Sequence, residues 1–338
     1  AGRAFRRPQV GNCPGMRVKD SVVVVTGASS GIGRATALAC ASAGAAVVLA
    51  ARRADALAEV AKECEAAGGQ ALAVPTDVTD ADAVQALARR AVERFGRIDV
   101  WVNCAAVTAF APFLEIPLEQ FRRILDVDVM GYVHGARAAL PYLRDQGKGV
   151  LINVSSVVAV VPQPYTHAYS MAKAAVRVLS ASLRQELRLD GAKGVKVCTV
   201  MPPTVDTPFF DHTANYTGRK AKAMPPVYSA ERVARTIVDL IRVPRREVLV
   251  GPMARNLLMQ SKFAPGLAER MMALQVDKMH LYRTKPAPAT SGNLFAPAPG
   301  TGSVSGGWHG RRRTALRRAA STAALLTGGL VAARRWGR

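Results

Sequence analysis

Tyr169 and Lys173 have the spacing and chemistry of a proton-transfer pair. They lie four positions apart in an Ala/Val/Leu pattern that runs on to Leu189, so a helix with both side chains on one face is predicted. A phenol with a pKa of about 10 is a poor acid or base at neutral pH, and a neighbouring ammonium lowers that pKa. Ser156 follows an apolar run that predicts a buried strand. Its hydroxyl could polarise a carbonyl while Tyr169 moves the proton.

The Tyr-x-x-x-Lys spacing alone is a weak signal, because this chain contains it twice. The second copy, Tyr216 to Lys220, lies in a non-periodic stretch and has Pro203 where the serine would be. We interpret the second copy as accidental. The first copy gains weight only from the elements around it.

A glycine turn early in the chain predicts a dinucleotide site. An apolar strand over residues 21–25 runs into Thr-Gly-Ala-Ser-Ser-Gly-Ile-Gly and then an Ala-rich helix to about residue 43. Glycines permit close approach of the backbone, and the helix N-terminus offers free N–H groups to a pyrophosphate. The alternative is a turn that only connects two elements. The predicted cofactor contacts here are Gly27, Ser29, Ser30, Gly31, Ile32 and Gly33.

The end of the next strand favours NADP(H) over NAD(H). NAD sites place a carboxylate there to bind the ribose 2′-hydroxyl. This chain has Arg52 and Arg53 after Ala51 instead, and guanidinium groups favour a 2′-phosphate. The alternative is that both arginines are solvated residues at the start of a helix.

The remaining elements alternate between strands and helices, which predicts an α/β fold. We expect a Rossmann-type doubly wound parallel sheet of about seven strands, in the order 3-2-1-4-5-6-7, with a C-terminal helical extension. Ligands bind such sheets beyond the strand C-termini, where Asn103 and Ser156 fall. Asp77 follows the third strand and is a candidate for the adenine amino group or, alternatively, the N-cap of the helix over 81–95. The predicted strands are 21–25, 46–51, 70–75, 98–103, 150–154, 195–201 and 248–250, and the other predicted helices are 54–67, 118–143, 169–189 and 230–241.

Composition narrows the class of protein. The net charge is +22, but residues 1–19 contribute five basic side chains and residues 311–338 contribute eight arginines, with no acid in either. Aromatic residues are only 6% and scattered, which disfavours nucleic-acid binding. The five cysteines are widely spaced without a C-x-x-C pair, which predicts reduced thiols and no metal site. Together with the lack of an apolar export signal in residues 1–15, this predicts a cytoplasmic protein.

The chain ends predict segments outside the catalytic domain. We expect a disordered or upstream segment over 1–15, a catalytic domain over 16–252, a helical segment over 253–285, a Pro/Gly-rich linker over 286–310 and a basic, apolar tail over 311–338. Residues 319–333 are apolar but too few to span a bilayer, and arginines flank them. Peripheral contact of the tail with an anionic membrane and a free basic tail are both left open. Residues 209–228 are aperiodic and predict a mobile loop over the site.

Together these motifs resemble those of the short-chain dehydrogenase/reductase family over about residues 18–252. They are T-G-x-x-x-G-x-G at 26–33, Asp77-Val78, Asn103 to Ala106, Ser156, Tyr169-x-x-x-Lys173 and the Pro-x-x-Val-x-Thr segment at 202–207. The resemblance implies hydride transfer between NAD(P)(H) and a carbonyl or alcohol, in a dimer or tetramer. It makes Tyr169 the acid/base, Lys173 the group that lowers its pKa and holds the nicotinamide ribose, and Ser156 the group that orients the carbonyl. It adds cofactor contacts at Asp77, Val78, Asn103, Ala105, Tyr169, Lys173, Pro202, Val205 and Thr207.

Three positions depart from the family pattern. Ala106 stands where a glycine is usual, and Pro203 replaces another glycine. Asp128, which we count among the candidate catalytic residues, stands where the family has a structural asparagine in the long helix, so a carboxylate near Lys173 is expected to raise the lysine pKa. We predict an NADP(H)-dependent reductase or dehydrogenase acting on an apolar substrate. One alternative is a reductase of 3-oxoacyl chains. The other is a non-catalytic NADP(H)-binding scaffold or redox-sensing regulator, and the departures at Cys104, Ala106 and Asp128 motivate this second alternative.

Overall fold

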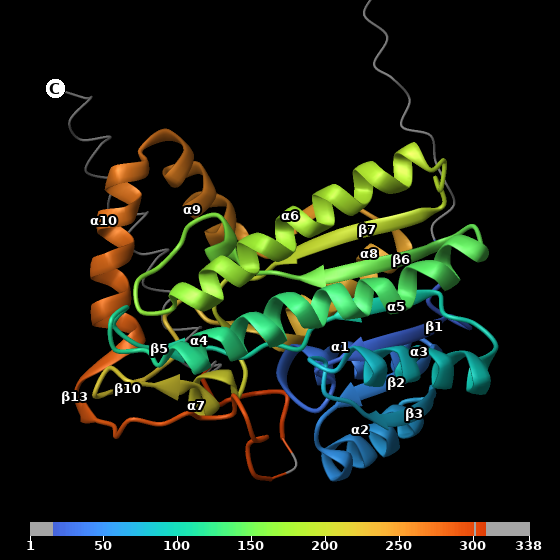
Figure 1. Cartoon of the computed structure of the whole chain (residues 1–338), viewed down its shortest axis with the longest axis horizontal. Coiled ribbons are helices and arrows are strands. Elements are labelled where there is room, and N and C mark those ends of the chain that lie inside the picture. The colour runs from blue at the N-terminus through green and yellow to red at the C-terminus, as the bar shows by residue number, and fades with distance from the viewer. Residues whose placement is uncertain (1–15, 301, 309–338) are drawn as a thin grey trace, which may run out of the picture.

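Seven parallel strands form the central sheet in the order β3-β2-β1-β4-β6-β7-β12 (Figure 1). The computed structural model describes residues 16–300 and 302–308. The order is that of the predicted Rossmann-type sheet, with β1 and β4 adjacent at the sheet centre where the winding reverses. The strands are β1 Val22–Thr26, β2 Ala46–Ala51, β3 Gln70–Pro75, β4 Val100–Asn103, β6 Gly149–Val154, β7 Val195–Met201 and β12 Glu247–Leu249.

Helices cover both faces of the sheet. One layer contains α1, α2 and α8, and the other contains α3, α5 and α6. In Figure 1, α5 and α6 cross in front of the sheet and α8 lies behind it. These helices are α1 Gly31–Ser42, α2 Ala54–Ala66, α3 Ala81–Phe95, α5 Gly131–Asp145, α6 His167–Leu189 and α8 Ala230–Arg242.

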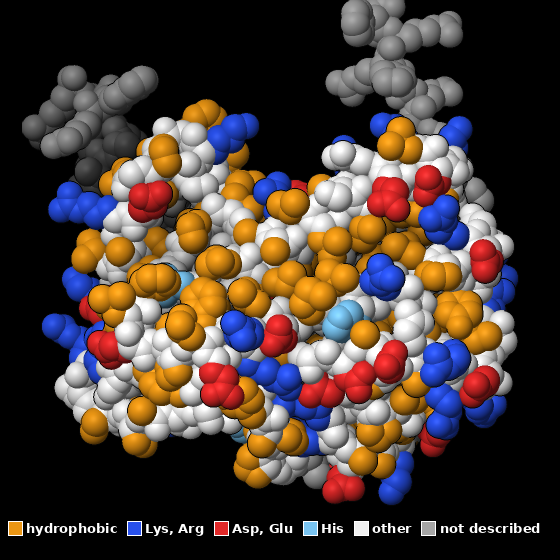
Figure 2. All heavy atoms as spheres, in the orientation of Figure 1, with side chains coloured by type: hydrophobic (Ala, Val, Ile, Leu, Met, Phe, Trp, Pro, Cys, Tyr) orange, Lys and Arg blue, Asp and Glu red, His pale blue; other side chains and the backbone are white. Residues whose placement is uncertain are grey.

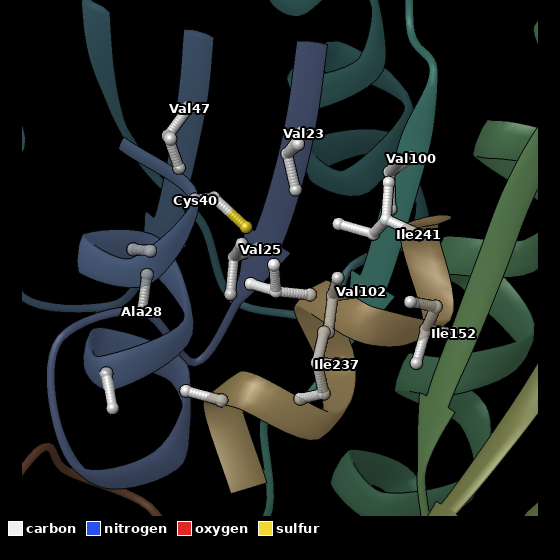
Figure 3. Packing of buried hydrophobic residues seen from close by; sticks show 14 of the residues in the cluster. Val23, Val25, Ala28, Cys40, Val47, Val100, Val102, Ile152, Ile237 and Ile241 are labelled. Atoms are coloured by element: carbon white, nitrogen blue, oxygen red, sulfur yellow. The ribbon is translucent and has the colours of Figure 1, made fainter. Parts of the chain in front are cut away.

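The strands are buried on both faces because successive side chains point to opposite helix layers. Val23 and Val25 of β1 pack with α1 and α8, whereas Val22 and Val24 pack in the other layer. In Figure 3, Val25 lies beside Val102 of β4 and near Ile237 of α8, and Val23 is paired with Val100 of β4. Burying an aliphatic side chain of this size stabilises a fold by about 1.5–3 kcal/mol. The continuous apolar runs of the sequence thus have the physical role expected of a doubly covered parallel sheet.

The long helix predicted over 118–143 is interrupted. It consists of α4 Leu118–Leu125, a π-helical turn Asp126–Met130, and α5. The π turn carries Asp128 and places that side chain among buried residues. Single π turns inside α-helices are frequent at functional sites. The apolar period of the sequence gave no signal of this turn.

The segment predicted as a mobile loop contains short regular elements. These pair with the strands β5 Ala109–Phe110, β8 Val205–Asp206 and β13 Leu281–Pro286. The pairing could not be predicted, because its partners lie tens of residues away in the sequence. The elements are α7 Phe209–His212, β9 Ala214–Asn215, β10 Arg219–Ala221 and β11 Tyr228–Ser229.

The C-terminal helical extension is present as predicted. It consists of α9 Pro252–Phe263, α10 Pro265–Gln275 and a π turn Val276–His280 that leads into β13. In Figure 1, α9 and α10 form a pair at one end of the molecule, beyond the start of α6. None of the helices within residues 16–300 and 302–308 is long and apolar enough to cross a bilayer. The predictions for residues 1–15 and for the tail over 311–338 fall outside the described residues.

Candidate active site

One cavity of about 310 Å³ lies at the C-terminal ends of the central strands. It is lined by the glycine turn, by the end of β2, and by the Ser156, Tyr169 and Lys173 side chains. The tertiary structure therefore brings together groups that are separated by more than 100 residues of sequence. Every predicted site residue except Asn103 and Asp128 lines this cavity.

The glycine turn packs against the end of β4. Gly27 has a φ of +70°, and a Cβ atom there would lie 2.8 Å from the Cα of Ala105. A Cβ on Gly33 would lie 2.1 Å from the carbonyl oxygen of Gly27. The Thr26 hydroxyl accepts hydrogen bonds from the N–H groups of Cys104 at 3.0 Å and Ala105 at 3.3 Å. Only glycine permits the backbone of the turn to lie this close to the end of β4. Without side chains at these positions, a dinucleotide phosphate can lie beside the turn.

Tyr169 and Ser156 face the cavity from two different elements. Tyr169 lies in the first turn of α6, and Ser156 lies directly after β6. The Ser156 hydroxyl donates to the carbonyl of Pro202 at 3.4 Å. Burial raises the pKa of Tyr169 to about 12, against the Lys173 ammonium and the Ser156 hydroxyl, which both lower it. Lys173 thus acts in the predicted direction, but burial outweighs it and the net shift is opposite to the predicted one.

Lys173 is held by three oxygen acceptors behind Tyr169. Its Nζ lies 3.2 Å from Asp128 Oδ2, and it donates to the Tyr132 hydroxyl at 3.1 Å and to the Val154 carbonyl at 3.4 Å. Burial lowers the pKa of Lys173, but the Asp128 carboxylate and the Tyr169 phenol group raise it above its ordinary value overall. Lys173 is therefore an ammonium at neutral pH, 5.3 Å from the centre of the Tyr169 ring.

Asp128 lies behind the cavity rather than in its wall. Its side chain is fully buried, and Oδ1 accepts the Val107 N–H at 2.8 Å. Burial raises the pKa of Asp128 above its ordinary value, while the Lys173 ammonium and the Val107 N–H oppose the rise. Asp128 thus acts on the reacting groups through Lys173, whose pKa it raises as expected, and its part in catalysis stays a prediction.

The Asn103 side chain also points away from the cavity. Its Oδ1 accepts the Trp101 indole N–H at 2.8 Å, and its Nδ2 donates to Asn153 Oδ1 at 2.9 Å and to the Tyr132 carbonyl at 3.3 Å. These bonds use the amide to join β4, β6 and α5. The Asn103 side chain is therefore bound to protein partners, and its predicted contact with the cofactor stays a prediction.

The arginines at the end of β2 are bound by the chain's own C-terminal segment. Arg52 donates to carbonyl groups of residues 293–295, and Arg53 donates to those of Ala298 and Gly300. Burial lowers the pKa of both guanidinium groups. The segment's composition predicted a linker, but it lies against the cofactor end of the cavity. The basic side chains and the nearby carbonyls are too far apart in sequence for this contact to be predicted.

Asp77 is held by side-chain contacts rather than by capping a helix. Its Oδ1 accepts from Thr79, and its Oδ2 accepts from Arg123 at 2.9 Å. Burial would raise its pKa, but the Thr79 and Arg123 hydrogen bonds lower it overall. The cap of α3 is Asp80, whose carboxylate accepts the N–H groups of Asp82 and Ala83. The alternative reading of Asp77 as an N-cap is therefore wrong.

Cys104 is a free thiol in the wall of the cavity. Burial raises the pKa of Cys104 to about 12, so almost none of it is thiolate at neutral pH. Cys40, Cys64 and Cys198 are also unpaired. Within residues 16–300 and 302–308, no cluster of three side chains with metal-binding chemistry occurs.

Three residues that contact the candidate site were not identified from the sequence. Tyr132 binds Lys173, Arg123 binds Asp77, and His280 lines the far end of the cavity with 3% of its surface exposed. None of them belongs to a local motif. Their positions depend on contacts between α5, α4 or the C-terminal extension and distant strands.

Comparison with known proteins agrees with this geometry. A family model described as short chain dehydrogenase matches residues 21–216. The uncharacterized oxidoreductase YxnA of Bacillus subtilis is 36% identical over 258 residues, which cover 76% of this chain and 72% of that protein. The probable oxidoreductase EphD of Mycobacterium tuberculosis is 42% identical over 206 residues, which cover 61% of this chain. The match spans only 34% of EphD, about a third of its length.

Solved structures share the fold. A short chain dehydrogenase/reductase from Burkholderia phymatum in complex with NAD has a TM-score of 0.67 and 28% identity, with coverage of 75% of this chain and 97% of that one. An alcohol dehydrogenase from the archaeon Thermococcus sibiricus, complexed with 5-hydroxy-NADP, has a TM-score of 0.60 and 28% identity, with coverage of 68% and 96%. With the family match over more than half of its length, this chain belongs to the short-chain dehydrogenase/reductase family.

Proposed function

We propose that the protein is an NADP(H)-dependent oxidoreductase that interconverts a carbonyl and an alcohol on an apolar substrate. The observation that carries the proposal is the convergence of Ser156, Tyr169 and Lys173 on one cavity that also contains the glycine turn. A bound nicotinamide would supply or accept the hydride. The proton of the same step would pass between the Tyr169 hydroxyl and the substrate oxygen.

The residues of the chain have distinct tasks in this proposal. The Ser156 hydroxyl orients and polarises the carbonyl oxygen, and the Tyr169 hydroxyl donates a proton to that oxygen in reduction. The Lys173 ammonium stabilises the phenolate that remains, since it lies 5.3 Å from the ring centre. In oxidation of the alcohol the proton moves in the opposite direction, and the Tyr169 phenolate accepts it as the base.

Arg52 and Arg53 support NADP(H) as the cofactor. Both line the cavity at the end of β2, and Ala51 stands before them where a carboxylate would favour NAD(H). The related structures hold either an NAD or a 5-hydroxy-NADP molecule, so the choice depends on this chain's own residues. Replacement of both arginines by alanine should raise the ratio of the KM for NADPH to the KM for NADH about tenfold or more. The exposed Arg89→Ala/Arg90→Ala pair is the control.

The far end of the cavity favours an apolar substrate with one hydrogen-bond donor. Phe110, Phe209, Phe210 and Met272 line it together with His280. The His280 Nδ1 lies 2.9 Å from the Lys222 carbonyl, which can only accept, so Nδ1 carries the proton and Nε2 is an acceptor. Burial lowers the pKa of His280 to about 4, which keeps the ring neutral. We propose that Nε2 accepts from a substrate hydroxyl or amide.

We also propose that the protein self-associates through the face formed by α4, α5 and α6. Large apolar side chains are exposed there, and Figure 2 shows apolar side chains gathered over this face. Val178 on α6 and Val243 after α8 are both 65% exposed and make a matched pair. Val178→Arg should lower the molar mass measured by light scattering to that of a monomer, whereas Val243→Arg should not. The exposed residues of the face are Leu118, Met130, Met171 and Val178.

Turnover assays on the full chain test the catalytic proposal. Oxidation of NADPH and NADH is followed with a panel of aldehydes, ketones and 3-oxoacyl thioesters. Tyr169→Phe should abolish turnover while NADPH still binds. The control is Tyr216→Phe, which alters the second Tyr-x-x-x-Lys copy; neither Tyr216 nor Lys220 lines the cavity. Binding of NADPH with no turnover of any substrate by the wild-type protein would instead favour the scaffold.

A further inference from the structure

The C-terminal segment contacts predicted cofactor-binding residues from Arg52 at the end of β2 to the neighbourhood of Thr207. We call residues 293–300 and 302–308 the strap; in Figure 1 it is the orange to red loop between α7 and α2. At the adenosine end, Arg52 Nη2 donates to the Asn293 carbonyl at 2.7 Å and Nη1 donates to the Phe295 carbonyl at 3.0 Å. Arg53 Nη1 donates to Ala298 at 3.0 Å and also to Gly300. Backbone carbonyls thus occupy the guanidinium donors assigned above to a 2′-phosphate.

The strap then passes the glycine turn. The Gly31 N–H, at the start of α1, donates to the Ser303 carbonyl at 2.8 Å. Arg34 Nη1 donates to the Gly302 carbonyl at 2.9 Å. These donors lie where the N-terminus of α1 would face a pyrophosphate. The strap therefore places carbonyl oxygens on the first N–H group of α1 and on Arg34 beside it.

The end of the strap is anchored beside Thr207. The Asp206 carboxylate accepts the Gly306 N–H at 3.0 Å, the Trp308 N–H at 2.8 Å and the Ser305 hydroxyl at 2.6 Å. The Trp308 ring lies 6.1 Å from the Phe210 ring, centre to centre. The strap thus extends from the adenosine arginines to the segment predicted to hold the nicotinamide.

We propose that the strap is an autoinhibitory segment that must leave the cleft before the dinucleotide binds. The strap occupies hydrogen-bond donors that are predicted to bind the dinucleotide. The cavity that remains has a volume of about 310 Å³, which is at the lower limit for a site that holds a drug-sized molecule. A 2′-phosphate has three oxygens and about two negative charges, so it competes for Arg52 and Arg53 better than neutral carbonyls do. The apparent affinity is reduced by the fraction of molecules with the strap released. This inference rests on the proposed NADP(H) function.

Two glycines of the strap provide a matched test in the full-length protein. Gly302 and Gly300 have nearly the same φ, +84° and +81°, so alanine strains the backbone equally at both. A Cβ on Gly302 would lie 2.5 Å from the Ser29 carbonyl and 2.8 Å from Arg53 Nη2, whereas one on Gly300 would meet nothing within 4 Å. Gly302→Ala should therefore push the strap off the cleft, and Gly300→Ala should not. Gly306→Ala is a second release variant, because its Cβ would lie 2.2 Å from the Thr207 carbonyl.

The experiment measures the Kd for NADPH and NADH by calorimetry, and hydrogen exchange of the strap amides with and without NADPH. We expect Gly302→Ala and Gly306→Ala to bind both dinucleotides about tenfold tighter than the wild type and Gly300→Ala. We also expect NADPH to increase exchange in the strap. Weaker or unchanged binding by the release variants, or slower exchange with NADPH, would overturn the proposal. Slower exchange would mean that the strap closes over a bound dinucleotide.

Different results would contradict the autoinhibition proposal and the NADP(H) proposal. Equal NADPH affinity in all four proteins would reject autoinhibition and leave NADP(H) use intact. If the release variants bound NADH, but not NADPH, more tightly than the wild type, the result would support autoinhibition by the strap and reject the proposed preference for NADP(H). No binding of either dinucleotide by any protein would reject both.

Discussion

The Nζ of Lys173 lies 3.2 Å from Oδ2 of Asp128, and neither side chain is more than 1% exposed. The two charges are held in the fully buried layer between α5, α6 and β6. The ion pair joins the π turn to the helix that carries Tyr169. Any change at Asp128 should therefore alter both the proton chemistry and the stability of the fold.

Asp128→Asn should move the pH dependence of alcohol oxidation to lower pH. The Asp128 carboxylate raises the pKa of Tyr169, so its removal stabilises the phenolate that acts as the base. We expect the rising limb of kcat/KM against pH to move down by about one pH unit. At a fixed pH on that limb, the rate should rise about tenfold. Asp145→Asn, on the exposed side of α5, is the control and should leave the profile in place.

Asp128→Ala should destabilise the protein more than Asp128→Asn does. Alanine removes the carboxylate that pairs with the buried Lys173 ammonium and leaves the Val107 N–H without its acceptor, and breaking a buried pair costs about 3–5 kcal/mol. Asparagine keeps one acceptor oxygen, so it still satisfies one of the two donors. Urea unfolding of the three proteins at pH 7 measures the difference. Equal free energies of unfolding for the two variants would mean that Lys173 finds another acceptor.

Gly33→Ala should unfold the glycine turn, whereas Gly266→Ala should not. The Gly33 Cβ would lie 2.1 Å from the Gly27 carbonyl, and overpacking of this kind costs about 1–3 kcal/mol. A Cβ on Gly266, in the first turn of α10, would meet nothing within 4 Å. Alanine there should stabilise the helix by about 0.5–1 kcal/mol. Thermal unfolding separates the two outcomes as shifts of Tm in opposite directions.

The stability should fall between pH 6.5 and pH 4 because His280 is buried in its neutral form. Burial lowers its pKa to about 4, so the unfolded chain binds this proton in that window and the folded chain does not. The stabilisation that depends on neutral His280 is fully present above the pKa that this histidine has in the unfolded chain, and it is lost as the pH falls toward the pKa in the folded protein. At about 1.36 kcal/mol per pH unit, it amounts to about 3 kcal/mol. His280→Gln should lose this part of the acid sensitivity in urea unfolding at pH 7, 5.5 and 4.5.

The sequence by itself determined the fold class, the strand order and the local motifs. Apolar runs of 4–8 residues and glycine turns are short-range features, so the β1 turn and the Tyr169 to Lys173 helix were predicted with nearly correct bounds. The same applies to the arginines at the end of β2. Each of these features depends on residues that are neighbours in the chain.

Only the tertiary structure decided how the charged and polar groups are partnered. The Asp128 to Lys173 pair joins residues 45 positions apart, the Asn103 amide reaches Asn153 at 50 positions, and Arg52 reaches Phe295 at 243 positions. Backbone carbonyls have no residue-specific signature, so a Pro/Gly-rich segment that binds through them looks like a linker. Burial is likewise set by distant neighbours, and it reverses the net pKa shift of Tyr169 from the one that the local Lys173 spacing predicts.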